Sequence, residues 1–183
     1  MGRADILCPP PSALEDTMIE VKVETIQVSL VSSHRVVVLK ELGAQRYLPI
    51  WIGPCEAEAI SVGAKGIDIV RPLTHDLIVN LLDAMDAELL YIHIGDLSDN
   101  TFFATLTVSA GDAELEIDSR PSDAIAIAVR LGVPIYVAES VMEDAGIMPD
   151  PDIRSQGETD TEGLSAFRDF LSSLNFDGPK DEG

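Results

Sequence analysis

Residues 89–118 contain three short segments in which apolar side chains stand at every second position, separated by turns at 98–100 and 111–112. A period of two residues indicates β-strands that bury one face. Turns this short join antiparallel neighbours, because parallel strands need a long crossover connection. This part of the chain therefore predicts a three-stranded antiparallel meander, and it excludes an all-parallel, doubly wound sheet.

A second set of three strands is predicted nearer the N-terminus, at 19–31, 35–42 and 46–52. The apolar residues of the first strand change parity near Glu24. This change predicts a β-bulge, since a slip of one residue turns every later side chain to the other face. Pro49 lacks a backbone N–H, so the third strand is expected at an edge of the sheet or at a bulge.

Helix-start signals follow both meanders, at Gly53-Pro54 and at the dipeptides Arg71-Pro72 and Arg120-Pro121. The clearest helix has an apolar stripe between Leu77 and Met85, with Thr74 as its expected N-cap. Helices are expected at 55–64, 74–85, 124–131 and 139–145, and a last strand at 133–137. The predicted fold class is therefore α+β: a mostly antiparallel sheet built from two three-stranded meanders with helices packed on it, each meander followed by a helix.

The length of 183 residues and the hydrophobic content of 46% suit one compact domain with short tails. We expect a flexible N-terminal tail at 1–17, the folded domain at 18–147, an acidic linker at 148–162, and a C-terminal amphipathic helix and tail at 163–183. The sequence contains neither a secretory signal nor a run of about 18 apolar residues. It therefore predicts a cytoplasmic protein with no membrane partner.

The chain is strongly acidic, with 32 Asp and Glu against 12 Lys and Arg and a net charge of −20. Such a chain is not drawn to phosphate backbones or anionic lipids by its overall field, because those partners favour clustered Lys and Arg. Glycine-rich phosphate loops, cysteine-rich zinc sites and the common hydrolase motifs are absent from the sequence. No organic cofactor is expected.

His75 and Asp76 fall in the first turn of the helix that follows Arg71-Pro72. One interpretation makes His75 a proton shuttle or metal ligand and Asp76 a carboxylate ligand, at a helix N-terminus that favours anions. The alternative is that Thr74 and Asp76 simply cap the helix and that His75 is a surface residue. Spacing alone does not decide between them.

Four polar residues are packed into the strand-to-helix junction at 118–123: Asp118, Arg120, Ser122 and Asp123. They could supply two carboxylates for a divalent cation, a guanidinium for a phosphoryl transition state and a hydroxyl donor. In the alternative interpretation, Asp123 is a capping-box acid and an Asp-Arg pair satisfies the polar groups of the junction. Both interpretations stay open at this point.

Other polar and aromatic residues carry weaker signals. Glu56 and Glu58 are two apart on a helix and do not share a face, so only one is expected to point toward a site. His93 is interpreted as a half-buried histidine of the sheet. Tyr47 and Trp51 share one face of their strand and are interpreted as packing or interface residues, and the small residues of the helices suggest self-association.

Three stretches resemble the signatures of the bifunctional nuclease domain family: RYLPIWIG at 46–53, RPLTHDL at 71–77 and DSRPSDAIA at 118–126. The resemblance spans about residues 19–147, and the segment 167–174 is similar to the C-terminal helix of many members. It implies a compact α+β domain that is usually a homo-oligomer and a nuclease that acts on DNA and RNA.

Together with the polar residues at the two junctions, the resemblance suggests a phosphodiesterase assisted by Mg²⁺ or Mn²⁺, whose ions would offset the acidity of the site. This hypothesis requires the two Arg-Pro helix starts to converge in space. The expected roles are metal binding by Asp76, Asp118 and Asp123, catalysis by His75, Arg120 and Ser122, and substrate binding by Arg71 and Arg120.

A second hypothesis is a non-enzymatic regulatory or interaction module, in which the two junctions only hold the fold. Its acidic tail and amphipathic helix would bind a basic partner. This hypothesis accounts more directly for the negative charge.

Overall fold

The computed structural model describes residues 18–28, 35–67 and 69–148. The predicted N-terminal tail, nearly all of the acidic linker and the C-terminal helix lie outside these residues. The elements in chain order are β1 (Met18–Val28), β2 (Arg35–Glu41), β3 (Tyr47–Ile52), α1 (Pro54–Ala64), α2 (Thr74–Ala84), β4 (Ala87–Ser98), β5 (Thr101–Ala110), β6 (Ala113–Ser119), α3 (Pro121–Leu131), β7 (Ile135–Ala138) and α4 (Glu139–Ala145).

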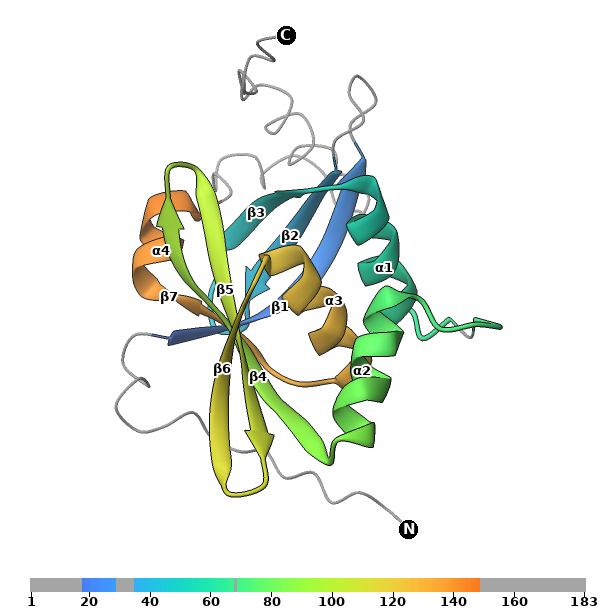
Figure 1. The fold of residues 1–183 in the computed structure, drawn as a ribbon. Coiled ribbons are helices and arrows are strands. Elements are labelled where there is room, and N and C mark those ends of the chain that lie inside the picture. The colour runs from blue at the N-terminus through green and yellow to red at the C-terminus, as the bar shows by residue number, and fades with distance from the viewer. Residues whose placement is uncertain (1–17, 29–34, 68, 149–183) are drawn as a thin grey trace, which may run out of the picture. The chain divides into compact units, whose positions relative to one another are not determined.

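The strands form one seven-stranded sheet in the order β3-β2-β1-β7-β4-β5-β6 (Figure 1). Strands β1–β3 and β4–β6 are the two antiparallel meanders predicted from the sequence, which confirms the α+β class. The short β7 lies between them, antiparallel to β1 and parallel to β4. One parallel pairing therefore joins two antiparallel halves.

Two local predictions about the first meander are confirmed. The register of β1 against β2 shifts between Val23 and Thr25, where the sequence changes parity. Strand β3, which contains Pro49, pairs with β2 and stands at one end of the strand order. A proline that cannot donate a hydrogen bond is tolerated at this position.

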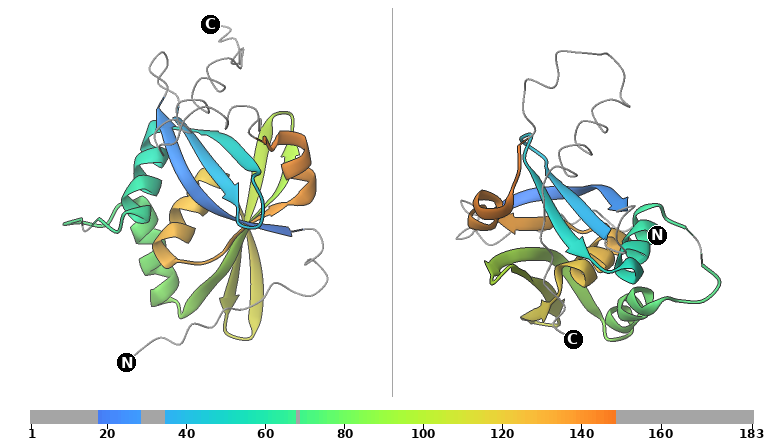
Figure 2. Two further views of the ribbon diagram at one scale, coloured as in Figure 1. Left: turned by 180° about the vertical axis from the view of Figure 1, so that it is seen from behind. Right: turned by 90° about the horizontal axis from the view of Figure 1, so that it is seen from above.

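Helices α1, α2 and α3 lie together on one side of the molecule, and α4 lies away from them beside β7 (Figures 1 and 2). Helix α3 contacts α1 and α2 as well as β4 and β5, so it is buried from several directions. Ala57 and Ala59 of α1 and Ala124, Ala126 and Ala128 of α3 are buried in the core. The small residues therefore serve helix packing within the chain.

Helix α2 differs from expectation at its start and along its apolar stripe. Leu73, rather than Thr74, is the N-cap, and the helix begins at Thr74. Leu77, Leu81 and Met85 are 53%, 51% and 73% exposed, whereas Ile78 packs against the core. The stripe is wider than the surface that the sheet and α3 can cover.

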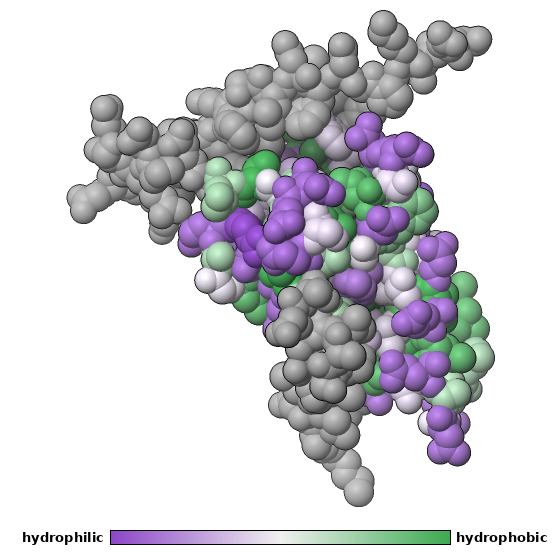
Figure 3. Space-filling model, turned by 90° about the vertical axis from the view of Figure 1, so that its left-hand side faces the viewer, coloured by the Kyte–Doolittle hydropathy of each residue, from purple (hydrophilic) through white to green (hydrophobic). Residues whose placement is uncertain are grey.

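The face of the molecule on the side of α4 mixes hydrophilic and hydrophobic residues (Figure 3). On this side Arg46 donates to Glu41, with 2.6 Å between Nε and Oε2, and to Glu139 of α4, with 2.6 Å between Nη1 and Oε1. These bonds tie the turn after β2 to α4. Within the described residues, none of the helices has the length and apolar character needed to cross a membrane.

Candidate functional site

A groove of about 770 Å³ lies between the helices and the second meander. Residues of α1, α2, α3, β5 and β6 line it. Its larger apolar lining residues are Leu73, Ile78, Leu82, Leu106, Val108, Ile117 and Ile127. Its acidic and basic lining residues are Glu56, Glu58, His75, Asp118, Arg120 and Asp123.

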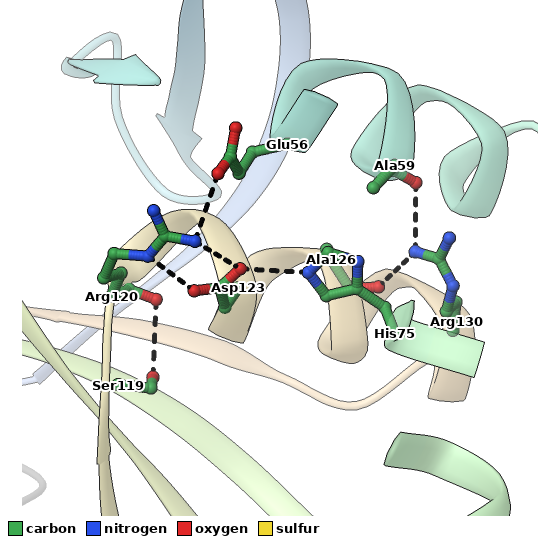
Figure 4. A network of polar contacts seen from close by, with 8 residues as sticks. All are labelled: Glu56, Ala59, His75, Ser119, Arg120, Asp123, Ala126 and Arg130. Carbon is green, nitrogen blue, oxygen red and sulfur yellow. Dashed lines mark hydrogen bonds and ion pairs between the residues drawn. The ribbon is translucent and has the colours of Figure 1, made fainter. Parts of the chain in front are cut away.

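The two Arg-Pro helix starts converge at this groove, as the nuclease hypothesis requires. His75, in the first turn of α2, lies with Nε2 3.0 Å from Oδ1 of Asp123, in the first turn of α3 (Figure 4). His75 is only 8% exposed. It is therefore not the surface residue that the alternative interpretation expected.

Arg120, the N-cap residue of α3, binds the same carboxylate. Its Nε donates to Oδ2 of Asp123 at 2.7 Å, and its Nη2 donates to Oδ1 at 3.2 Å. Nη2 also lies 3.1 Å from Oε1 of Glu56 (Figure 4). Because 67% of the Arg120 side chain is exposed, this guanidinium is held between two carboxylates and remains open to solvent.

The electrostatics of this cluster keep Asp123 ionised. Burial on its own raises the pKa of the Asp123 carboxyl, but hydrogen bonds from Arg120 and His75 outweigh it and leave the pKa below its usual value. The hydrogen bond to Asp123 in turn raises the pKa of Arg120. Asp123 is thus a carboxylate that holds His75 on one side and Arg120 on the other.

Glu56 is the fourth residue of this cluster. The sequence did not indicate whether Glu56 or Glu58 would belong to it. The expectation that only one of them faces a site is wrong, because both glutamates line the groove, and Glu56 forms the ion pair with Arg120. It occupies the third position of α1, and its carboxylate folds back over the N-cap residue Gly53. A Cβ at Gly53 would collide with that carboxylate, so the glycine allows Glu56 to adopt this position.

Asp76 is held in a different way, and it is not among the residues that line the groove. Its Oδ2 accepts the backbone N–H of Leu73 at 2.8 Å, which is the capping role that the alternative interpretation gave it. Its Oδ1 accepts from Nε of Arg130 at 2.6 Å. Despite the opposing effect of burial, these two bonds lower the pKa of Asp76.

Arg130 joins the three helices around the groove. Besides Asp76 of α2, it contacts the carbonyl oxygens of Ala59 in α1 and Ala126 in α3, with 3.0 Å and 2.6 Å from Nη1 (Figure 4). Its side chain is only 7% exposed. Sequence spacing drew no attention to Arg130, because nothing near position 130 resembles a motif.

The remaining candidates take three different positions. Asp118 borders the groove, but it pairs with Thr105 on β5, so strand alternation directs its side chain away from the face of Ile117. Ser122 is buried, and Arg71 is exposed. Neither Ser122 nor Arg71 is among the groove residues.

The three carboxylates expected to bind metal do not come together. Within residues 18–28, 35–67 and 69–148, no group of three His, Cys, Asp or Glu side chains is placed to hold a metal ion. Glu56 and Asp123 converge on the guanidinium of Arg120, which is itself a cation between them. The residues as arranged do not fit a metal centre made wholly of protein ligands, and metal binding stays a prediction.

Comparison of the sequence with known proteins shows its family. The sequence profile of the bifunctional nuclease domain matches residues 37–150, which include both helix starts and the groove. The chain belongs to the bifunctional nuclease domain family. The matched region contains every candidate site residue of this bifunctional nuclease domain.

An uncharacterised protein of Mycobacterium tuberculosis is 41% identical over 167 residues, which cover 86% of this chain and 96% of that protein. Bifunctional nuclease 2 of Arabidopsis thaliana is 33% identical over 108 residues, or 57% of this chain and 33% of the plant protein. Bifunctional nuclease 2 of Oryza sativa subsp. japonica is 31% identical over 58% of this chain and 34% of its own length. The domain described here thus corresponds to about a third of each plant relative.

Proposed function

We propose that this bifunctional nuclease domain hydrolyses phosphodiester bonds in DNA or RNA. The observation that carries the proposal is the His75–Asp123–Arg120 network at the edge of the groove, which combines a proton-transfer group, a carboxylate and an exposed guanidinium. The names of the plant relatives, bifunctional nucleases, support the same activity.

Arg120 binds the scissile phosphate in this proposal. A guanidinium matches two phosphate oxygens and stabilises the charge that develops on them during transfer. Its exposure allows it to release Glu56 and take up a phosphate while Asp123 still holds its Nε. Substrate binding therefore exchanges one anionic partner of Arg120 for another.

His75 transfers the proton, and Asp123 positions it. When Nε2 carries the hydrogen that is donated to Asp123, Nδ1 keeps a lone pair that can accept a proton from the attacking water. The water oxygen bonds to phosphorus as the P–O bond to the leaving sugar oxygen breaks, and that oxygen takes a proton from solvent. The ionised Asp123 carboxylate fixes this tautomer and stabilises the imidazolium that forms. Ser122 is buried and does not line the groove, so it takes no step in this scheme.

Assistance by Mg²⁺ or Mn²⁺ enters this proposal as a condition to be tested. Mg²⁺ is often held by one or two carboxylates together with substrate phosphates, which a structure of the protein alone does not contain. No catalytic step in the scheme runs through a metal. An assay with Mg²⁺, Mn²⁺ or EDTA decides the point.

The test uses the full chain and fluorescent oligonucleotides of DNA and RNA, single-stranded and double-stranded. His75→Ala and Asp123→Asn are compared with the wild type, and Lys65→Ala serves as a control because Lys65 is exposed, outside the groove lining and assigned no role. We expect at least a hundredfold loss of cleavage in His75→Ala and Asp123→Asn, assayed at a temperature where circular dichroism shows both variants folded. Equal cleavage in all four proteins would place the activity elsewhere.

The exposed side of α2 favours a second role, self-association. Leu77, Leu81 and Met85 are each more than half exposed on this helix. We propose that a second copy of the chain covers them, since exposed apolar patches are typical of interfaces. Light scattering should report an oligomer that Leu77→Gln/Leu81→Gln converts to monomer, and a monomeric wild type contradicts the proposal.

A cytoplasmic location remains a prediction from the sequence.

A further inference from the structure

The groove offers very little positive charge to a polyanion. Arg120 is the only Lys or Arg among the described residues that line it. Four carboxylates face or border the same space, those of Glu56, Glu58, Asp118 and Asp123. A protein that binds a long nucleic acid typically neutralises several phosphates with Lys and Arg, about 6–10 in strong binders. The lining of this groove can neutralise one.

The chain near the groove adds little to this charge. Arg71 is the nearest cation in sequence to a lining residue of α2, two positions before Leu73, and it is exposed outside the groove. The chain as a whole carries −20. A second or third phosphate of a long strand would therefore meet a repulsive surface.

The rest of the groove is apolar and small. Side chains from three helices and two strands form its apolar lining, among them Ile78, Leu106, Ile117 and Ile127. Its volume of about 770 Å³ lies within the range of about 300–1,000 Å³ that is typical of small-molecule sites. Tracks for long single strands use rows of aromatic side chains, and the described lining of this groove contains no Phe, Tyr or Trp.

An apolar surface with a single guanidinium at its edge suits one nucleotide unit, with the base on the aliphatic side chains and the phosphate at Arg120. We infer that the groove binds dinucleotides and other short oligonucleotides, and that these are better substrates than long DNA or RNA. This inference rests on the proposed nuclease activity and names the substrate class of the same site.

The kinetic test compares a dinucleotide with a 20-residue strand of the same base composition. We expect kcat/KM per phosphodiester bond to be at least as high for the dinucleotide. A site with one phosphate contact should lose only about fourfold in kcat/KM between 50 and 200 mM salt, whereas 6–10 contacts lose about 10³–10⁵. A strand favoured more than tenfold with a steep salt dependence would overturn the inference and leave the nuclease activity intact.

The binding test does not depend on turnover. Calorimetry measures the affinity of a dinucleotide whose scissile ester oxygen is replaced by a methylene group, so that it keeps its charge and is not hydrolysed. Ile117→Thr is paired with Leu115→Thr, because both residues lie on β6 and are 45% and 47% exposed, and only Ile117 is among the groove residues. Both variants should fold, since neither side chain is in the core.

We expect Ile117→Thr to weaken binding about fivefold through lost apolar contact, and Leu115→Thr to leave it unchanged. Equal effects of the two variants, or no binding to the wild type, would overturn the inference. Binding that depends on Ile117 without hydrolysis of either substrate would support the assigned ligand and contradict the nuclease activity. The failures of the two proposals are thus distinguishable.

Discussion

The aspartates in the first turns of α2 and α3 each pair with an arginine, with the same chemistry and opposite surroundings. Asp76 and Asp123 each occupy the third position of a helix. Each accepts a hydrogen bond from the Nε of an arginine, at 2.6 Å from Arg130 and 2.7 Å from Arg120. The Arg130 side chain is 7% exposed and the Arg120 side chain is 67% exposed.

The difference shows how one kind of pair can serve structure in one place and chemistry in another. Arg130 is enclosed by α1, α2 and α3, so its charge depends on Asp76 and two carbonyl groups for compensation. Arg120 keeps water as an alternative partner and faces the groove. The buried pair is fixed, whereas in the proposed reaction the exposed pair exchanges a carboxylate for a phosphate.

The largest effect should come from breaking the buried pair. Arg130→Ala leaves the Asp76 carboxylate without its arginine and removes the bonds to Ala59 and Ala126. Removal of one partner of a fully buried ion pair costs about 3–5 kcal/mol, and the cost here should be nearer about 2–3 kcal/mol, because the Asp76 side chain is 27% exposed and keeps its bond from Leu73. We expect a loss of that size in the free energy of unfolding, measured by urea denaturation.

Arg120→Ala is the matched control, because an exposed ion pair contributes only about 0–1 kcal/mol. A smaller loss for Arg130→Ala than for Arg120→Ala would invalidate the distinction between the two pairs.

The next largest effect concerns activity. Here Arg120 should matter more than Arg130, the reverse of their effects on stability. Arg120→Ala should lower kcat/KM for oligonucleotide cleavage by about 10²–10³-fold, the usual cost of losing one group that stabilises transition-state charge. Arg120→Lys should restore part of the rate, since an ammonium keeps the charge but not the paired geometry. The measurement is initial-rate kinetics on variants with wild-type Tm.

A loss caused by unfolding would also appear in circular dichroism. If Arg120→Ala keeps full activity, the exposed pair is structural like the buried one.

Much of the fold could be predicted because antiparallel meanders are encoded locally. The parity change at Glu24 and the proline at position 49 each mark a backbone feature where they occur. The position of β7 could not be predicted, because a four-residue apolar strand carries no information about its neighbours. The exposure of Leu77 could not be predicted either. Sequence periodicity identifies the apolar face of a helix, but it does not show which element packs against that face.

The site could be predicted only in part for a related reason. Asp76 and Asp123 have similar local signals, as both follow an Arg-Pro dipeptide within a few residues and fall in the first turn of a helix. Tertiary packing decides that Asp123 meets His75, 48 positions away, and that Asp76 meets Arg130. A hypothesis could require the two helix starts to converge, but spacing along the chain does not determine whether they do.

The third effect concerns acid stability and compares the two carboxylates directly. The pKa values of Asp76 and Asp123 are both lowered in the folded protein. Each therefore contributes stability that is present above the unfolded pKa of about 3.9 and is lost as the pH falls through the lower folded value. We expect Asp76→Asn and Asp123→Asn to flatten the loss of stability below about pH 4.

Denaturation curves between pH 2 and pH 7 measure this effect. The larger change should come from Asp76→Asn, because its partner Arg130 is buried. An unchanged pH profile in both variants would contradict the role of the two arginines in ionising these acids.

The smallest effect tests the exchange of partners at Arg120. Glu56 binds Nη2 of Arg120 in the unliganded protein, so a phosphate must displace it. Glu56→Gln removes the competing charge and should tighten binding of a non-hydrolysable dinucleotide about threefold, a gain comparable to the ~1 kcal/mol limit of an exposed ion pair. Glu58→Gln is the matched control, because Glu58 lines the same groove and changes the charge by the same amount. If both variants tighten binding equally, the gain comes from net charge alone, and Arg120 does not exchange Glu56 for phosphate.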